Sequence, residues 1–248
     1  MDLNQKVILL TGASGFFGSA LAPELARAEA TLALHFHSNE QQASSIQRQI
    51  ISDDGSARIY QADLSKVPEA EALVERVLAD FNHLDVIIHS AGNFRKTPFG
   101  QIREDDWNEV FATHVKGFFF LAQKAAPALR ASKGKILIFA DIAAYRPYLS
   151  YLPYSAGKAA LLSLNKGLAR ALAPEVTVNA IAPGIIERPA QKELQDEKLR
   201  QRIPLQRFGT VEEITRAVLF LLKDVDFMTG SVLRIDGGRI ISTTDEIP

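Results

Sequence analysis

Tyr154 and Lys158 stand four positions apart in the segment YSAGK, and their spacing suggests proton-transfer chemistry. On a helix, side chains at i and i+4 share one face, so the ammonium of Lys158 can lie beside the phenol of Tyr154. A neighbouring cation favours phenolate and draws a tyrosine pKa of about 10 towards neutral pH. The pair is therefore a candidate proton donor with its own tuning group. The alternative is a packing aromatic and a surface charge.

A carboxylate, Asp141, precedes Tyr154 by 13 residues and follows an apolar segment at 135–140. An ionised carboxylate only accepts hydrogen bonds and would repel the oxygen of a carbonyl substrate. Asp141 therefore suits a substrate that presents N–H groups, or a carboxylic acid that stays protonated and donates. The simpler interpretation is that Asp141 caps the end of a strand.

A glycine-rich segment at 11–18, TGASGFFG, follows the first apolar segment and precedes a helical pattern. Such a turn brings backbone N–H groups and a helix N-terminus towards a pyrophosphate. Its position between a strand and a helix predicts a dinucleotide site. The same glycines could also serve a tight turn that binds nothing.

Seven short apolar segments alternate with helical patterns and could position these groups. The segments cover residues 6–11, 31–36, 57–62, 85–90, 135–140, 176–181 and 231–236. Continuous Val, Ile and Leu runs are typical of parallel strands that are buried on both faces. Helical periodicity is clear over 69–81, 109–129 and 159–173. We therefore predict an α/β fold, a Rossmann-type doubly wound parallel seven-stranded sheet with helices on both faces, as a single domain over 1–248.

The end of the second predicted strand bears on the choice between NAD(H) and NADP(H). A carboxylate there would hydrogen-bond the adenosine ribose and repel a 2′-phosphate, but the chain has His37, Ser38 and Asn39. Ser38 and Asn39 can donate hydrogen bonds to a phosphate, which favours NADP(H). His35 and His37 could also ligate a metal, but they have no acidic or cysteine partners nearby, so we predict a pocket wall and no metal site.

Composition limits the class of partner. The 248 residues are 47% hydrophobic and 23% charged, with no cysteine and a net charge of −1. The chain lacks a basic stretch for nucleic acid and an apolar run near the roughly 20 residues that span a bilayer. The N-terminus also lacks the pattern of a signal peptide. We expect a small-molecule partner and a cytoplasmic protein.

The segment at 188–204 is highly charged and flanked by prolines. Its simplest interpretation is a solvated surface helix. The functional interpretation is a substrate lid over about 186–206, because the preceding strand ends at the edge of the sheet where ligands bind.

Several short motifs occur in a characteristic order. After the glycine-rich loop come ADL at 62–64, HSAG at 89–92, YSAGK at 154–158, PG at 183–184 and RIDGG at 234–238. In this combination the chain resembles the short-chain dehydrogenase/reductase family over essentially its full length. The resemblance implies that Tyr154 exchanges the proton and that Lys158 holds the nicotinamide ribose while lowering the tyrosine pKa. The implied cofactor contacts are Gly12, Ser14, Phe17 and Gly18 at the phosphates, Asp63 and Leu64 at the adenine, and Ala91 and Gly92 at the ribose, with Pro183 and Gly184 completing the set.

The chain departs from the ordinary family pattern at three positions. Asp141 replaces a serine, His114 replaces an asparagine, and Phe16 stands at the middle glycine of the first loop. Within the family, the aspartate resembles the pteridine reductase branch, which usually has an arginine at the position of Phe16. The segments LALHFHSN and HSAGNFRKTPF are also similar to that branch, and Phe94 would be the aromatic that stacks on the pterin.

These observations give one main hypothesis and two alternatives. The main hypothesis is an NADPH-dependent reductase of a pterin-like (dihydropteridine) or related C=N or C=O substrate, bound by Phe94, Asp141 and Tyr154. His114 would either shuttle protons near neutral pH or be an ordinary helix residue. The alternatives are a generic carbonyl or 3-oxoacyl reductase, and a cofactor-binding regulatory protein without turnover. The resemblance also suggests a homo-oligomer, a tetramer or dimer, with contacts through helices around 103–130 and 154–173.

Overall fold

The computed structural model describes residues 1–188 and 197–242 and contains one parallel sheet of seven strands. The strand order is β3-β2-β1-β4-β5-β6-β7. The strands are β1 (Val7–Thr11), β2 (Thr31–Phe36), β3 (Ser56–Gln61), β4 (Val86–His89), β5 (Lys135–Phe139), β6 (Thr177–Pro183) and β7 (Val232–Ile235). Each lies within two residues of its predicted position, because a strand covered on both faces needs a continuous apolar run.

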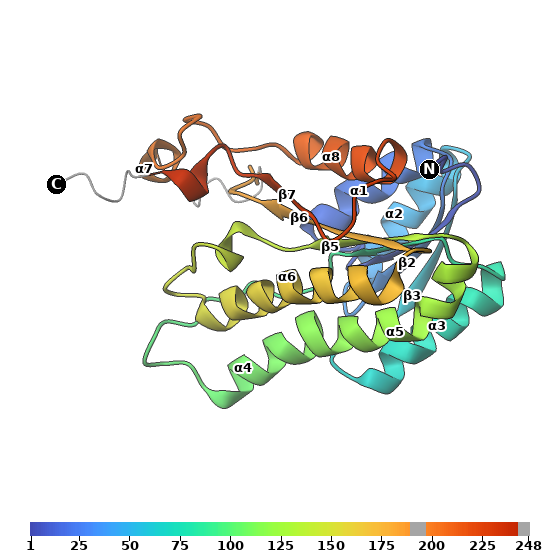
Figure 1. Cartoon of the computed structure of the whole chain (residues 1–248), viewed down its shortest axis with the longest axis horizontal. Coiled ribbons are helices and arrows are strands. Elements are labelled where there is room, and N and C mark those ends of the chain that lie inside the picture. Colours follow the sequence, from blue (N-terminus) through green and yellow to red (C-terminus); the bar gives the residue numbers. More distant parts are fainter. Residues whose placement is uncertain (189–196, 243–248) are drawn as a thin grey trace.

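Helices cover both faces of the sheet, as predicted. One face carries α1 (Phe16–Arg27), α2 (Glu40–Ser52) and α8 (Val211–Lys223), and the other carries α3 (Val67–Phe81), α5 (Phe118–Ala131) and α6 (Leu152–Leu172) (Figure 1). Each face has its own apolar core. Residues such as Leu73, Phe118 and Leu161 fill one core, and Leu21, Ile46 and Val218 belong to the other. The doubly wound architecture is confirmed.

The helix predicted at 109–129 is part of a longer helix made of three consecutive segments. It begins with α4 (Glu104–Val110), continues through a π-helical segment, η1 (Phe111–Gly117), and ends as α5. The sequence pattern predicted one continuous helix here and did not predict the π segment. Such segments often occur at functional sites.

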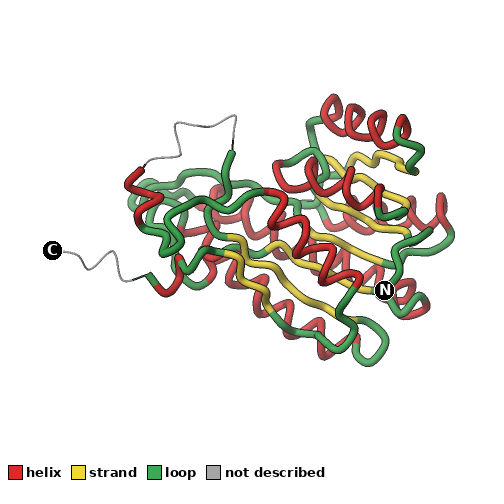
Figure 2. The backbone as a smooth tube through the Cα atoms, turned by 90° about the horizontal axis from the view of Figure 1, so that it is seen from above, coloured by secondary structure: helices red, strands yellow, loops and turns green. Residues whose placement is uncertain are grey.

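Short helices and loops complete the described chain. They include η2 (Ile142–Ala144), α7 (Glu197–Gln201) and η4 (Arg239–Ile241). Loops are concentrated at one end of the sheet (Figure 2). Part of the predicted lid, 189–196, lies outside the described residues. Across the described residues, no helix is both long and apolar enough to cross a membrane.

The direction of strand order reverses between β1 and β4, which are neighbours in the sheet. In open parallel sheets, ligands bind beyond the carboxyl ends of the strands at such a switch point. The loops after β1, β4 and β5 therefore converge on one site.

Candidate active site

Three predicted residues meet beyond the carboxyl end of β5. Asp141 caps η2, where its Oδ1 accepts the N–H of Ala143 at 2.7 Å. Tyr154 lies in the first turn of α6, where Pro153 suits the start of a helix. Lys158 follows one turn later on the same buried side. Asp141 therefore caps the short helix η2 rather than the strand itself, and this cap is only one of the contacts of its carboxylate.

The hydroxyl of Tyr154 donates a hydrogen bond to Oδ2 of Asp141 at 2.7 Å. Nζ of Lys158 donates to the carbonyl oxygen of Phe139 at 2.6 Å and lies 5.6 Å from the centroid of the Tyr154 ring. Tyr154 and Lys158 are 8% and 7% exposed, so both act in a largely dehydrated setting. The structure thus brings Tyr154, Asp141 and Lys158 together, with a hydrogen bond between Tyr154 and Asp141 and with Lys158 beside the Tyr154 ring.

The pKa of Tyr154 shifts in the opposite direction to the one expected from the sequence. Burial, together with the adjacent charge of Asp141, raises the pKa of Tyr154 well above its usual value. Burial lowers the pKa of Lys158 to about 8, with Asp141 opposing the shift, and burial raises the pKa of Asp141. Lys158 lies over the ring of Tyr154 and donates to the Phe139 carbonyl, whereas Asp141 touches the phenolic oxygen. The expected depression of the tyrosine pKa is therefore wrong for this arrangement.

His114 lies in the π-helical segment and is fully buried. Its Nε2 accepts the backbone N–H of Asn93 at 2.9 Å, and its ring packs edge-on against Tyr154 with centroids 5.7 Å apart. The ring fits because position 92 is glycine; a Cβ there would lie 2.5 Å from the imidazole. Burial lowers the pKa of His114 to about 3, so the ring is neutral near pH 7 and is a poor proton shuttle.

Phe94, which the sequence predicted to stack on a pterin ring, lies at the edge of the catalytic site. Its side chain is 48% exposed and borders the same cleft as Tyr154. The ring stacks on Tyr151 with centroids 4.2 Å apart and an interplanar angle of 6°, and it meets Tyr154 edge-on at 4.8 Å. Sequence reasoning missed Tyr151, which precedes α6 and fixes the orientation of Phe94.

Two adjoining clefts contain most of the predicted site. The catalytic cleft, of about 320 Å³, is lined by Gly15, Phe16, Phe17, Ser90, Gly92, Asn93, Phe94, His114, Phe139, Ala140, Asp141, Tyr154, Lys158 and Arg188. The nucleotide cleft, of about 440 Å³, is lined by Gly12, Ser14, Gly15, His35, His37, Ser38, Asp63, Leu64, Ser65, Ser90, Ala91, Gly92, Asn93, Glu109 and Thr113. Shared residues of the glycine-rich loop and the loop after β4 join them into one elongated site.

The nucleotide cleft fits a negatively charged dinucleotide. Gly12 has a φ of +70°, and a Cβ there would lie 2.8 Å from Cα of Ala91, so only glycine fits the turn. The first turn of α1 has no acidic residue, and its N-cap, Gly15, provides no side-chain hydrogen bond. Backbone N–H groups and the helix dipole therefore favour an anion at this end of α1.

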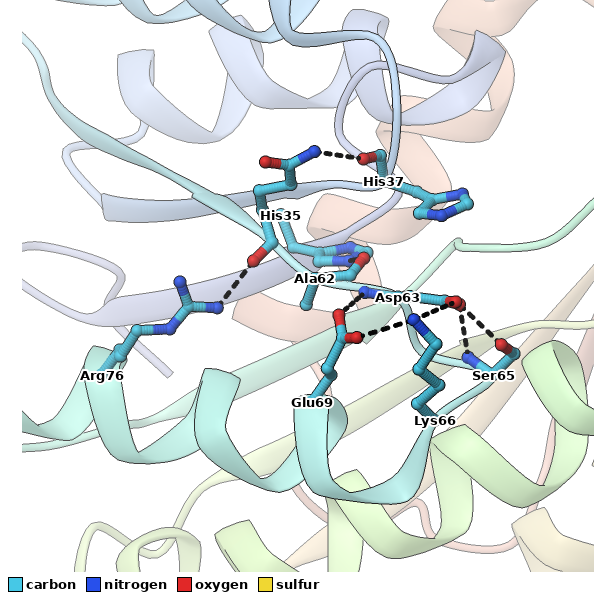
Figure 3. Close-up of polar contacts among 9 residues, drawn as sticks. His35, His37, Ala62, Asp63, Ser65, Lys66, Glu69 and Arg76 are labelled. Carbon is cyan, nitrogen blue, oxygen red and sulfur yellow. Dashed lines mark hydrogen bonds and ion pairs between the residues drawn. The ribbon is translucent and has the colours of Figure 1, made fainter.

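His35 connects three parts of the nucleotide cleft. Its Nδ1 accepts the N–H of Gly12 at 3.1 Å. Its Nε2 donates to the carbonyl of Ala62 at 3.0 Å, and Figure 3 shows His35 beside Ala62. Burial lowers its pKa to about 4, so it is neutral and holds this tautomer. His35 does line the cleft, as predicted, but its link between the glycine-rich loop and the end of β3 was not foreseen. Among the described residues, no group of side chains could hold a metal.

The outer wall of the nucleotide cleft is polar. His37 lies across from Asp63, whose Oδ1 accepts hydrogen bonds from the N–H of Ser65 at 3.0 Å and from its hydroxyl at 2.7 Å (Figure 3). The backbone N–H of Asp63 in turn donates to Glu69 at 2.7 Å. These contacts fix the segment that the sequence predicted to border the adenine.

Four predicted cofactor residues do not line either cleft. Gly18 is buried in α1 against the carbonyl of Gly12, and Asn39 uses its side-chain oxygen to cap α2. Pro183 is buried at the end of β6, and the N–H of Gly184 donates to the carbonyl of Ile235 in β7. Phe17 and Lys158 line the catalytic cleft instead of the nucleotide cleft.

Sequence reasoning also missed Arg188, which it treated only as part of a charged segment. The guanidinium carbon lies 4.5 Å from the centroid of the Phe16 ring, and both residues line the catalytic cleft. A cation thus reaches the glycine-rich loop from a distant part of the sequence.

The family model described as enoyl-(acyl carrier protein) reductase matches residues 12–239, nearly the whole chain. The chain belongs to the short-chain dehydrogenase/reductase family. It is therefore an NAD(P)-dependent oxidoreductase. The 3-oxoacyl-(acyl-carrier-protein) reductase FabG of Staphylococcus aureus is 32% identical over 94% of this chain and 97% of its own. A protein of Synechocystis sp. named 3-oxoacyl-(acyl-carrier-protein) reductase is 30% identical over 96% of this chain and 98% of its own.

Solved structures of other short-chain dehydrogenase/reductases superpose over almost the whole chain. The enzyme of Serratia marcescens gives a TM-score of 0.90 at 27% identity and covers 97% of this chain and 100% of its own. A blue fluorescent protein from a metagenomic library, in complex with NADPH, gives 0.90 at 28% identity and covers 96% and 99%. The names of the sequence relatives do not support the pteridine reductase branch that Asp141 and Phe94 suggested.

Proposed function

We propose that this chain is an NADPH-dependent reductase of a ketone carbonyl, with 3-oxoacyl thioesters or small ketones as its substrate class. The observation that carries the proposal is the hydroxyl of Tyr154, held by Asp141 at 2.7 Å in a buried cleft that adjoins the nucleotide cleft. The names of the sequence relatives support a 3-oxoacyl substrate rather than a pterin.

Different residues of the chain would bind the cofactor, donate the proton and stabilise the resulting charge. Gly12, Ser14 and Ala91 would hold the dinucleotide along the nucleotide cleft. When bound, the nicotinamide would supply the hydride. Tyr154, whose raised pKa keeps it protonated at neutral pH, would give its proton to the substrate oxygen. The ammonium of Lys158 would stabilise the phenolate that remains.

Asp141 is compatible with a carbonyl substrate when it is neutral. Burial raises the pKa of this carboxyl group, although hydrogen bonds from Ala143 and Tyr154 oppose the shift. A protonated Asp141 donates to a substrate oxygen, whereas an ionised one repels it. Substrate binding would further exclude water and favour the neutral form.

A second candidate substrate, a pterin-like ring, is favoured by Phe94 and Asp141. Phe94 offers an exposed ring at the edge of the catalytic cleft, and an ionised Asp141 would accept hydrogen bonds from ring N–H groups. This candidate ranks below the ketone because it depends on two side chains without support from the relatives.

The proposed preference for NADPH follows from the end of β2. His37 and Ser38 line the nucleotide cleft where a carboxylate would repel a 2′-phosphate. The neighbour bound to NADPH is consistent with this choice. The proposal also includes a homo-oligomer with contacts through helices around 103–130 and 154–173. It further includes a substrate lid at about 186–206 and a cytoplasmic location.

The deciding experiment is a comparison of NADPH oxidation with three substrate groups. We expect turnover with acetoacetyl thioesters or small ketones, and only background rates with dihydropterin or dihydrofolate. The reverse result would favour the pterin-like candidate. Tight NADPH binding without turnover across the whole panel would instead favour a regulatory protein.

A further inference from the structure

Tyr148 brings a second hydroxyl to Asp141. It lies in the loop between η2 and α6, where its N–H donates to Oγ of Ser155 at 3.1 Å and its carbonyl accepts the N–H of Tyr151 at 2.8 Å. Its ring meets that of Tyr151 edge-on, with centroids 6.4 Å apart. The Tyr148 hydroxyl lies 3.4 Å from Oδ1 of Asp141. The backbone and ring contacts of Tyr148 therefore hold its hydroxyl beside the carboxylate.

The two oxygens of Asp141 have different partners. Oδ2 accepts the hydroxyl of Tyr154 at 2.7 Å, and Tyr154 lines the catalytic cleft. Oδ1 accepts the N–H of Ala143 at 2.7 Å and the hydroxyl of Tyr148. Tyr148 is not among the described residues that line the catalytic cleft. It therefore acts through Asp141 rather than on a substrate directly.

The hydroxyl of Tyr148 favours the ionised form of Asp141. Burial raises the pKa of Asp141, whereas the hydrogen bonds to its two oxygens and the charge of Lys158 on α6 oppose that shift. A carboxylate only accepts hydrogen bonds, so Tyr148 is the donor in this contact. A separation of 3.4 Å is long for an O–H···O hydrogen bond, so the contact is weaker than the one from Tyr154.

Tyr148 itself stays protonated near neutral pH. Burial raises the pKa of its hydroxyl above the usual value, and the charge of Asp141 adds to this shift. Arg239 in η4 opposes the shift, and Asp236, which follows β7, adds to it. Tyr148 is therefore a permanent donor, whereas Tyr154 must give up its proton in the proposed reaction.

We propose that Tyr148 is a positioning residue whose hydroxyl holds Oδ1 of Asp141 and favours the ionised carboxylate in the empty site. A carbonyl substrate needs the neutral form, which can donate to its oxygen, so the contact weakens the binding of such a substrate. The contact with Asp141 is independent of the function proposed above, whereas its effect on carbonyl substrates rests on that function. Removal of the hydroxyl should improve the binding of a ketone, and the loss of a merely structural contact would not.

The first arm of the test measures the titration of Asp141 and needs no turnover. Carbon-13 NMR of protein labelled at the aspartate carboxyl groups gives the midpoint, and the signal that is missing in Asp141→Asn identifies the residue. In Tyr148→Phe the midpoint should rise by about half a pH unit, the effect of a weak hydrogen bond to a charged group. Tyr145→Phe, which removes an exposed hydroxyl three residues away, is the matched control and should leave the midpoint unchanged.

The second arm measures the reduction of ethyl acetoacetate with saturating NADPH, at about one pH unit above the native midpoint of Asp141. A rise of half a unit in the midpoint increases the neutral fraction of Asp141 about threefold at that pH. KM in Tyr148→Phe should therefore fall about threefold. The value of kcat should change less, because the proton donor Tyr154 is retained.

Tyr148→Leu removes the ring as well as the hydroxyl and should move the midpoint in the same direction. Urea unfolding at the assay pH shows whether each variant is folded. The proposal is overturned if the Asp141 midpoint does not rise in Tyr148→Phe, or if it rises while KM for the ketone stays the same. If the native protein reduces no ketone, the function proposed above fails, and the titration alone then decides the role of Tyr148.

Discussion

Before a substrate binds, the hydroxyl of Tyr154 donates to the carboxylate of Asp141, and in the proposed mechanism this group becomes neutral only when a carbonyl substrate enters the cleft. Asp141 stabilises the phenol by accepting its proton in a hydrogen bond and destabilises the phenolate by its charge. Tyr154 therefore stays protonated near neutral pH and can act as a proton donor. A reduction needs such an acid, because the substrate oxygen must gain a proton as carbon gains hydride.

Replacement of Tyr154 by phenylalanine tests this role directly. Tyr154→Phe should lower kcat by about 10²–10⁴-fold, the usual contribution of a positioned general acid. The affinity for NADPH, measured by calorimetry, should stay the same. Tyr145→Phe, which removes a hydroxyl at a 42% exposed position, should retain the native rate. Native turnover in Tyr154→Phe would exclude the proposed mechanism.

Asp141→Asn should change the pH dependence of catalysis in a defined direction. The charge of Asp141 adds to the effect of burial on the pKa of Tyr154 and opposes the effect of burial on that of Lys158, so it raises both pKa values. Without that charge both pKa values fall. The alkaline decline of kcat/KM, expected near pH 8 in the native enzyme because the pKa of Lys158 is about 8, should move to lower pH.

The measurement is a pH–rate profile of kcat/KM, with Glu187→Gln as a nearby exposed control. An alkaline decline that keeps its position in Asp141→Asn would show that the carboxylate does not tune the two groups.

At the scale of elements, the nucleotide cleft depends on contacts between strands that are distant in sequence. His35 in β2 joins the glycine-rich loop after β1 to the residue that follows β3. The contact with Gly12 requires the neutral imidazole, since protonation would remove the acceptor at Nδ1, whereas the contact with Ala62 needs only the N–H at Nε2. The geometry of the phosphate-binding turn is thereby linked to the protonation of one buried side chain.

His35→Gln should reduce the amount by which the free energy of unfolding falls between pH 7 and pH 4. The pKa of His35 is about 4 in the folded protein, because of burial, against about 6.5 when unfolded. The neutral imidazole contributes its full share to the free energy of unfolding above about pH 6.5. This share falls by about 3 kcal/mol as the pH falls towards 4.

Urea unfolding at pH 7 and pH 4 gives the free energy at each pH, and the difference should be smaller in His35→Gln by about this amount. His37→Gln, two residues along, controls for the replacement of a histidine. An unchanged difference in His35→Gln would contradict the assignment.

The order and type of the elements were predictable because each depends on local pattern. Apolar runs located β1 to β7 within two residues, and the motif order indicated which loops form the site. The contacts that decide the chemistry were not predictable, because they join distant residues. The position of Lys158 relative to Tyr154, the stacking of Arg188 on Phe16 and the π turn around His114 all depend on three-dimensional packing. Sequence spacing therefore identified the trio but gave the wrong direction for the pKa of Tyr154.

At the scale of the whole molecule, cofactor binding should stabilise the fold. A ligand at 100 times its Kd adds about 2.7 kcal/mol to the free energy of unfolding. NADP⁺ should therefore raise Tm more than NAD⁺ at equal concentration, because no carboxylate follows β2 at positions 37–39. Ser38→Asp should reverse this order. A larger shift with NAD⁺ in the native protein would contradict the proposed preference.

The strand order reverses between β1 and β4, and the residues before and after about position 90 contribute differently to the two clefts. The earlier part supplies most of the nucleotide cleft, and the later part supplies Asp141, Tyr154 and Lys158. The two functions of the site, cofactor binding and proton transfer, therefore come mainly from different parts of the chain. Three residues of the earlier part, Gly15, Phe16 and Phe17, also line the catalytic cleft, and the ring of Phe16 contacts Arg188 of the later part, so the two parts meet inside the site.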